Sequence, residues 1–441
     1  MRKPTLDQEI FKKRRDKLGT QTNGAAIIVP AHPEMLRNHD VHYPYRQDSH
    51  LYYLTGFDEP ESVLVLRPGM NPEYVLFVRK RDVVRETWDG FRYGPDGAER
   101  EFKVDKSYTI DEIDKVLPML LDEVDRVYYR MFQNQEFDSH LKQALENVRV
   151  KQGRSGLGLL PIIDSSEILG EMRLKKEPIE LEWLRKACDI SAEGHLAGMK
   201  FAHTGANERE VQAVIEYTYR MHGAQREGYG SIVAAGGNAT TLHYVFNDQP
   251  MHDGDLLLVD SGAEFNYYTG DITRTYPVNG KFTDVQAKFY EKVLSANKAI
   301  IKMIRPGVAF KTLQDTTIEL MTEAMLDLGI IRGSANHIIE QQLFKKYYPH
   351  GVSHWLGMDV HDVGLYKVKN ESRRLEAGMC FTVEPGLYVP VDDQDAPKQF
   401  RGLGVRIEDN IVVTDIGCEV MTTKAPKEIK DLEEVIGKGT H

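Results

Sequence analysis

The chain has 441 residues, with 56 lysines and arginines against 67 aspartates and glutamates, which gives a net charge of −11. This length allows two or three domains, and the hydrophobic fraction of 41% is ordinary for a soluble globular protein. The acidic balance argues against a nucleic-acid-binding protein, because phosphate binding needs a basic face.

The cysteines and the apolar runs bear on the compartment. Cys188, Cys380 and Cys418 match no zinc or redox spacing, which favours a reducing setting. No apolar run approaches the roughly 18 residues that a membrane span needs. The N-terminal segment MRKPTLDQEIFKKRRDKLG is charged throughout and lacks the apolar core of a secretory signal. We therefore expect a cytoplasmic protein with neither nucleic-acid nor membrane partners.

Short apolar runs and polar helical stretches are mixed from about residue 25 to residue 165. The runs AAIIVP, SVLVLRP and YVLFVRK are bounded by Pro, Gly and charged residues, so they predict buried strands. The stretches EIDKVLPMLLDEV and SHLKQALENV predict helices. This mixture is typical of an α/β domain, which we place at residues 1–174.

The pattern changes near residue 170, where a long amphipathic stretch begins. In EWLRKACDISAEGHLAGM the apolar residues recur at intervals of three and four, which predicts a helix following Pro178. Further helices are predicted between strand pairs, at ANEREVQAVIEYTYRMHG, DVQAKFYEKVLSANKAIIKMI and TLQDTTIELMTEAMLDLG. We therefore place a second domain at residues 175–441.

The segment HGVSHWLGMDVHDVG, residues 350–364, is rich in histidine. His350 and His354 have the spacing of two ligands on one helical face, but a zinc helix of the H-E-x-x-H type needs a glutamate where Gly351 stands. Gly357 also disfavours a helix interior, and the alternation in DVHDVG suits a strand or an extended loop. The partners of these histidines must therefore lie elsewhere in the chain.

Two aspartates flank a predicted hairpin. The apolar strand DLLLVD ends in Asp260, and after a turn through Asn266 and Gly270 a second strand begins at Asp271. Side chains alternate along a strand, so Asp271 shares a face with Thr273. A hairpin would bring the two carboxylates together, although either aspartate could instead cap a turn.

Two glutamates lie in similar settings. MCFTVEPGLYV carries Glu384 and GLGVRIEDNIVVT carries Glu408, each within an apolar strand. A charge buried in such a strand is costly unless it is paired or bound to metal, and Arg406 could neutralise Glu408 as an ion pair. Four such carboxylates and a histidine-rich segment exceed what turn caps and ion pairs usually require, so we favour metal binding.

The order of these motifs resembles that of the pita-bread metallopeptidases, a family that includes methionine aminopeptidase, prolidase and aminopeptidase P. The two aspartates, HGVSHWLGMDVHDVG, TVEPGLY and RIED follow one another as in that family. The segment VHYPYRQDSHLYYLTGF and the region of Trp88 look most like two-domain aminopeptidase P of the bacterial kind. The resemblance implies an α+β protein, in which a smaller N-terminal α/β domain precedes a C-terminal pita-bread catalytic domain.

Carried over residue by residue, the resemblance implies a dinuclear metal site. Asp260 would bind one ion, and His354 with Glu384 the other. Asp271 and Glu408 would bridge both ions. This oxygen-rich set suits Mn²⁺, Co²⁺ or Fe²⁺. The resemblance to aminopeptidase P favours two Mn²⁺ per subunit, with Zn²⁺ as a further alternative.

The resemblance also implies roles around the ions. Glu384 would take a proton from the attacking water and hand it to the leaving amine. His243 and His361 would face the substrate, one of them at the peptide carbonyl or its oxyanion. Arg406 would orient Glu408 and offset negative charge. Substrate contacts or pocket walls are further implied at Asp40, Trp88, Arg154, Tyr229, His350 and Tyr388.

The implied function is that of a Xaa-Pro aminopeptidase, which releases the N-terminal residue from peptides with proline in the second position. Prolidase, a dipeptidase with the same five ligands, is the first alternative. Creatinase, which works without metal, and a non-catalytic binding protein of the same fold are disfavoured by the complete ligand set. Family members are often homo-oligomers, so we expect a dimer or tetramer acting on peptide substrates.

Overall fold

The computed structural model describes residues 6–439 and divides the chain into two compact units, Met1–Leu169 and Gly170–His441. The first five residues of the charged N-terminal segment lie outside the described residues. None of the described helices combines the length and the apolar character that a membrane crossing requires. The domain boundary between residues 174 and 175 stays a prediction.

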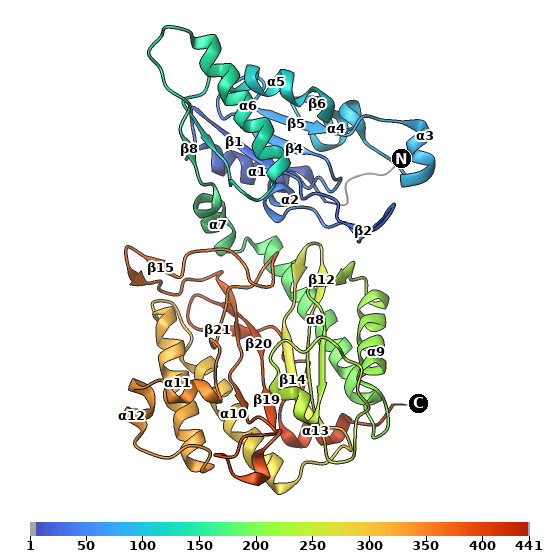
Figure 1. The fold of residues 1–441 in the computed structure, drawn as a ribbon, viewed down its shortest axis with the longest axis vertical. Coiled ribbons are helices and arrows are strands. Elements are labelled where there is room, and N and C mark those ends of the chain that lie inside the picture. Colours follow the sequence, from blue (N-terminus) through green and yellow to red (C-terminus); the bar gives the residue numbers. More distant parts are fainter. Residues whose placement is uncertain (1–5, 440–441) are drawn as a thin grey trace. The chain divides into compact units, whose positions relative to one another are not determined.

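The first unit is built on a six-stranded mixed sheet with the strand order β6-β5-β4-β1-β7-β8 (Figure 1). The three predicted apolar runs form neighbouring strands in the middle of this sheet, where nearly every residue is buried. The sheet strands are β1 (Ala25–Pro30), β4 (Val63–Leu66), β5 (Tyr74–Val78), β6 (Lys106–Thr109), β7 (Arg126–Tyr128) and β8 (Ile162–Ile163).

Two helices cover one face of this sheet. The apolar sides of α5 (Ile113–Leu121) and α6 (Gln135–Gln152) form one core with alternate residues of the central strands, such as Ile28 and Val65. Both helices were predicted, and the α/β class of this domain is confirmed. The remaining elements are α1 (Gln8–Gly19), β2 (Leu36–Asn38), β3 (Val41–His42), α2 (Ser49–Thr55), α3 (Val83–Asp89), α4 (Gly94–Phe102) and the short η1 (Ile110–Glu112).

The second unit places short sheets between the helix pair α8–α9 and the helix pair α10–α11 (Figure 1). All four helices were predicted from the sequence. Helices α8 and α9 approach closely at Gly194 because this residue has no side chain. A Cβ there would lie 2.2 Å from the Tyr219 ring. Helix α7 (Ser166–Leu174) crosses the boundary between the units. The helices within the second unit are α8 (Pro178–Phe201), α9 (Glu208–Met221), α10 (Asp284–Met303), α11 (Phe310–Asp327), α12 (Ala335–Glu340) and α13 (Ile429–Val435), with the short η2 (Gly236–Thr240), η3 (Leu343–Lys346) and η4 (Lys398–Phe400).

Two antiparallel pairs in this unit set the positions of the acidic residues. β11 pairs with β14 so that Asp260 lies opposite Thr273, and β17 pairs with β20 so that Val383 lies opposite Asp409. The strands are β9 (Arg226–Glu227), β10 (Ile232–Ala235), β11 (Leu256–Ser261), β12 (Ala263–Phe265), β13 (Tyr268–Thr269), β14 (Ile272–Pro277), β15 (Lys367–Val368), β16 (Glu371–Ser372), β17 (Cys380–Val383), β18 (Gly386–Tyr388), β19 (Gly404–Arg406), β20 (Asp409–Val413) and β21 (Cys418–Val420).

Candidate active site

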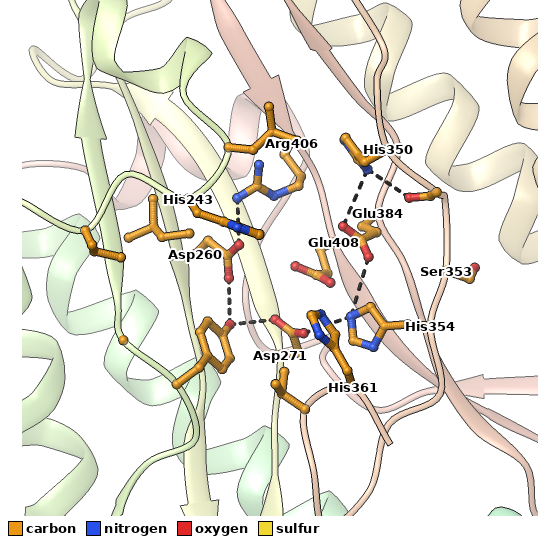
Figure 2. A pocket seen from close by; sticks show the side chains of 17 residues that line it. His243, Asp260, Asp271, His350, Ser353, His354, His361, Glu384, Arg406 and Glu408 are labelled. Carbon is orange, nitrogen blue, oxygen red and sulfur yellow. Dashed lines mark hydrogen bonds and ion pairs between the residues drawn. The ribbon is translucent and has the colours of Figure 1, made fainter. Parts of the chain in front are cut away.

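The predicted hairpin between the two aspartates is present. Strand β11 carries Asp260, the chain turns through the small β12–β13 hairpin, and Asp271 stands directly before β14. The Tyr229 hydroxyl lies between the carboxylates, 2.6 Å from Asp260 Oδ1 and 2.5 Å from Asp271 Oδ1. A single hydroxyl therefore spans the two aspartates (Figure 2).

The two glutamates reach the same place from the other strand pair. Glu384 follows β17, and the Thr382 hydroxyl lies 3.2 Å from its Oε1. Glu408 lies between β19 and β20 and accepts a hydrogen bond from the Thr273 hydroxyl at 2.7 Å. The two strand pairs thus converge at their carboxylates.

His354 lies between the carboxylates of both strand pairs. Its Nδ1 lies 3.0 Å from the carbonyl oxygen of Trp355, which leaves Nε2 facing the acids. Nε2 is 3.3 Å from Asp271 Oδ2 and 3.5 Å from Glu384 Oε1. Residues 350–364 form no helix, as the sequence predicted.

The cluster holds more negative charge than its own cations neutralise. Burial, together with the charge of Asp271, raises the pKa of Glu384 to about 7, against the opposing charge of His354. Burial and the neighbouring carboxylates raise the pKa of Glu408 well above its usual value. Burial disfavours the charged form of His354, yet the hydrogen bond with Asp271 and the charge of Glu384 raise its pKa to about 9.

These residues face a cavity of about 450 Å³ (Figure 2). His243 and His361 are exposed to it, and no hydrogen bond to another described residue holds either ring. The cavity is lined by the five predicted ligands and by Tyr229, Gly230, Ile232, Leu242, His243, Val245, His350, Gly351, Ser353, Val360, His361 and Arg406.

Arg406 does not contact the residue that the sequence suggested. We expected it to orient or neutralise Glu408, but its Nη2 donates to Asp260 Oδ2 at 2.6 Å. Its hydrogen bonds reach Glu408 through Thr273, whose hydroxyl lies 3.1 Å from Arg406 Nε, and its charge opposes the rise in the pKa of Glu408. The long side chain extends from β19 toward β11, so the tertiary arrangement rather than the sequence neighbour decides its partner.

His350 and Tyr388 form a chain of hydrogen bonds with Arg406. The Tyr388 hydroxyl accepts from Arg406 Nη1 at 2.9 Å and lies 2.8 Å from His350 Nε2. His350 Nδ1 lies 2.8 Å from the Gly351 carbonyl, so it donates there and Nε2 accepts from Tyr388. Burial and the charge of Arg406 lower the pKa of His350 to about 4, which keeps this ring neutral. Tyr388 lies behind the lining rather than in it.

Three predicted substrate contacts belong to the first unit. Asp40 is exposed at the turn between β2 and β3, Trp88 in α3 is 82% exposed, and Arg154 is exposed just beyond α6. All the residues that line the cavity belong to the second unit. The roles of these three side chains stay predictions.

The structure also identifies supporting residues that the sequence analysis did not select. Thr382 Oγ1 accepts from the backbone N–H of His354 at 3.2 Å, in addition to its contact with Glu384. Asn410 binds both backbone groups of Asp271, accepting from its N–H at 2.8 Å and donating to its carbonyl. Thr382 precedes Glu384 by two residues on one strand face, so strand alternation was a usable signal.

The donor set fits divalent metal ions. Among the described residues, ligand atoms of Asp271, His354 and Glu408 all lie within 4.8 Å of one another. Glu384 adjoins His354, and Asp260 joins the group across the Tyr229 hydroxyl. A buried cluster of carboxylates is stable only when cations compensate it, and oxygen donors with one imidazole suit Mn²⁺, Fe²⁺, Co²⁺ or Zn²⁺.

Known proteins share this architecture along nearly the whole chain. The Xaa-Pro aminopeptidase of Haemophilus influenzae is 40% identical over 433 residues, which cover 98% of both chains. Human Xaa-Pro aminopeptidase 3 is 36% identical, over 99% of this chain and 87% of its own. Two solved structures align over 98% of both chains: Pseudomonas aeruginosa aminopeptidase PepP, at TM-score 0.94 and 42% identity, and zinc-substituted Escherichia coli aminopeptidase P with product, at TM-score 0.93 and 40% identity.

Two family matches divide the chain in the same order as its two units. Residues 11–128 match the aminopeptidase P N-terminal domain, and residues 182–415 match metallopeptidase family M24. The resemblance drawn from the sequence motifs is thereby confirmed, as is the predicted fold class. The chain belongs to metallopeptidase family M24, among the members that carry the aminopeptidase P N-terminal domain.

Proposed function

We propose that this protein is a metal-dependent Xaa-Pro aminopeptidase, which releases the first residue of peptides that carry proline in the second position. The observation that supports this most strongly is the convergence of all five predicted ligand side chains on one cavity, in a chain about 40% identical to named Xaa-Pro aminopeptidases over nearly its full length. We further propose a cytoplasmic homo-oligomer, either a dimer or a tetramer.

Two divalent ions, which we propose to be Mn²⁺, would be held by the five side chains. Asp260 would hold one ion and His354 with Glu384 the other, while Asp271 and Glu408 would contact both. Bound there, the ions supply a water that loses its proton near neutral pH and a Lewis acid for the scissile carbonyl. Tyr229, Thr273 and Thr382 would keep the carboxylates oriented through their hydroxyl groups.

We assign the proton transfers to Glu384. Its carboxylate faces the cavity and can carry a proton from the attacking water to the departing proline nitrogen. His243 and His361 lie exposed to the same cavity and can donate hydrogen bonds to the peptide carbonyl or to the oxyanion that forms from it. Arg406 fixes Asp260 and, through Tyr388, keeps His350 in one tautomer.

An X-Pro bond has no N–H on its nitrogen, so a site that accepts it recognises the proline ring by shape rather than by a hydrogen bond. Apolar side chains in the cavity wall, among them Ile232, Leu242 and Val245, can contact such a ring. Two relatives about 40% identical to this chain are named Xaa-Pro aminopeptidases, which supports this substrate class.

The direct test is peptide cleavage after dialysis against a chelator, with and without added Mn²⁺. We expect an X-Pro-Y tripeptide to release free X and Pro-Y, identified by mass, only when metal is restored. The matching X-Ala-Y peptide should be cleaved far more slowly. Preference for an X-Pro dipeptide over the tripeptide would favour prolidase, and no metal-dependent cleavage of either would favour a binding protein.

A further inference from the structure

Few side-chain contacts hold the ring of His361 in place. It lies in the irregular segment 356–366, its side chain is exposed, and its ring contact is an edge-on packing against His354, with centroids 4.4 Å apart. A histidine that must meet a substrate group within hydrogen-bond distance needs a fixed position. Its support must therefore come through the backbone.

The next residue supplies that support. Asp362 is 6% exposed and lies between two buried cations, Arg173 in the last turn of α7 and Lys176 in the short segment that joins α7 to α8. Arg173 Nη2 donates to Asp362 Oδ1 at 2.5 Å, and Lys176 Nζ donates to Asp362 Oδ2 at 2.9 Å. Arg173 also reaches Asp359, earlier in the same segment, at 2.7 Å. The backbone N–H of Asp362 donates to the Trp355 carbonyl at 2.8 Å.

Helix α7 also holds the C-terminal end of the segment 356–366. Glu171 accepts from the backbone N–H of Leu365 at 3.0 Å and pairs through both oxygens with Arg373 at 2.6 Å. The close fit leaves no room at Gly364, whose φ is +129° and whose added Cβ would lie 2.8 Å from Leu174. Residues 171–176 therefore hold the segment 356–366 at several points.

Fixing Asp362 also restrains His361. Asp362 directly follows His361, so anchoring the buried Asp362 also anchors the backbone that carries His361, whose exposed side chain lines the cavity. Burying two cations and an aspartate is costly unless the pairing is close, and an apolar cluster of similar volume could stabilise the fold as well. The charged arrangement contributes directional hydrogen bonds that an apolar cluster lacks.

We propose that Arg173 and Lys176 are positioning residues for catalysis, because they hold Asp362 and thereby keep His361 directed at the peptide carbonyl. This inference rests on the proposed function, in which His361 faces the substrate. Neither cation lines the cavity.

A double-mutant cycle on the full-length, Mn²⁺-loaded protein tests the proposal. Arg173→Gln should lower kcat/KM for an X-Pro-Y tripeptide on the order of tenfold, with two metal ions per subunit retained. In a His361→Ala background the same change should cost less than about twofold, because the side chain that it positions is gone. Arg185→Gln, which breaks an exposed ion pair with Glu419 in the same unit, is the matched control and should leave kcat/KM unchanged.

Either of two kinetic results would overturn the proposal. One is a kcat/KM for Arg173→Gln within about twofold of the parent protein, and the other is an equal loss in both backgrounds, which marks a general structural role. Loss of metal from Arg173→Gln would likewise count against it. If Arg173→Gln does not fold, Lys176→Gln, which leaves the Arg173–Asp362 pair intact, is judged by the same criteria.

A readout without substrate separates this proposal from the proposed function. Hydrogen exchange of peptides that span residues 356–366 should be faster in Arg173→Gln than in the parent protein, while exchange in β17 should be unchanged. Unchanged exchange in 356–366 would refute the positioning role even if the parent protein cleaved no peptide. An inactive parent protein with faster exchange in the variant would instead refute only the peptidase assignment.

Discussion

The two sides of the candidate metal site differ in how their negative charge is compensated. On one side, Asp260 accepts a hydrogen bond from the Arg406 guanidinium and another from the Tyr229 hydroxyl. On the other side, Glu384 and Glu408 crowd around His354, and burial raises the pKa of both glutamates. The chain's own groups thus offset the charge of Asp260 (Figure 2), whereas the proposed metal ions would offset the charge of the two glutamates.

The largest expected effect comes from the side that depends on cations. His354→Ala removes the one nitrogen donor of the cluster, so turnover should fall by about a thousandfold or more and the metal content should drop below two ions per subunit. Steady-state kinetics and metal analysis by mass spectrometry measure both. The control is His337→Ala on the exposed surface of α12, which should change neither. Activity above about one tenth of the parent would contradict the ligand role.

The next effect tests the side that the chain compensates itself. Arg406→Met leaves Asp260 without its cation and breaks the hydrogen-bond chain to Tyr388, so kcat should fall by roughly 10–100-fold with metal still bound. Arg406→Lys keeps the charge but loses the planar guanidinium group, so its kcat should lie between those of the parent protein and Arg406→Met. An unchanged kcat in Arg406→Met, measured at saturating substrate, would mean that the metal ions alone compensate Asp260.

A smaller effect should follow from Thr382→Val, which keeps the side-chain shape. Its hydroxyl accepts the N–H of His354 and contacts Glu384, so its loss should lower kcat/KM by about tenfold. The matched control is Thr317→Val, because the Thr317 hydroxyl is also buried but bonds only the backbone of its own helix among the described contacts. Equal losses in both variants would point to stability rather than orientation.

The smallest effect is expected at Tyr229, whose hydroxyl lies between Asp260 and Asp271. Tyr229→Phe removes a hydroxyl from two carboxylates that the metal ions also hold, so kcat/KM should fall by only about threefold to tenfold. A loss beyond about a hundredfold would mean that the hydroxyl takes part in the reaction itself. Measuring kcat and KM separately distinguishes weaker binding from slower turnover.

Sequence reasoning succeeded where periodicity carries the information. Alternation along strands placed Asp271 and Thr273 on one face, and the structure joins Thr273 to Glu408 across the sheet. The apolar periods of three and four predicted α8 to α11 because each of these helices buries one side.

It failed where the outcome depends on tertiary distances. Arg406 was assigned to Glu408, two positions away, and its charge does act on that carboxylate, but its direct hydrogen-bond partner is Asp260, 146 residues earlier in the chain. Asn410 was not selected from the sequence, and only the structure shows that it bonds the backbone of Asp271. Short strands such as β7 and β8 were not predicted, because two or three residues show no usable period.

The central claim is that five side chains of the second unit hold two divalent ions in one cavity. Anomalous diffraction at the manganese edge, from crystals grown with excess Mn²⁺, measures this directly. We predict two strong peaks per subunit among Asp260, Asp271, His354, Glu384 and Glu408, bridged by Asp271 and Glu408. A single peak, or none within this cavity, would contradict the account.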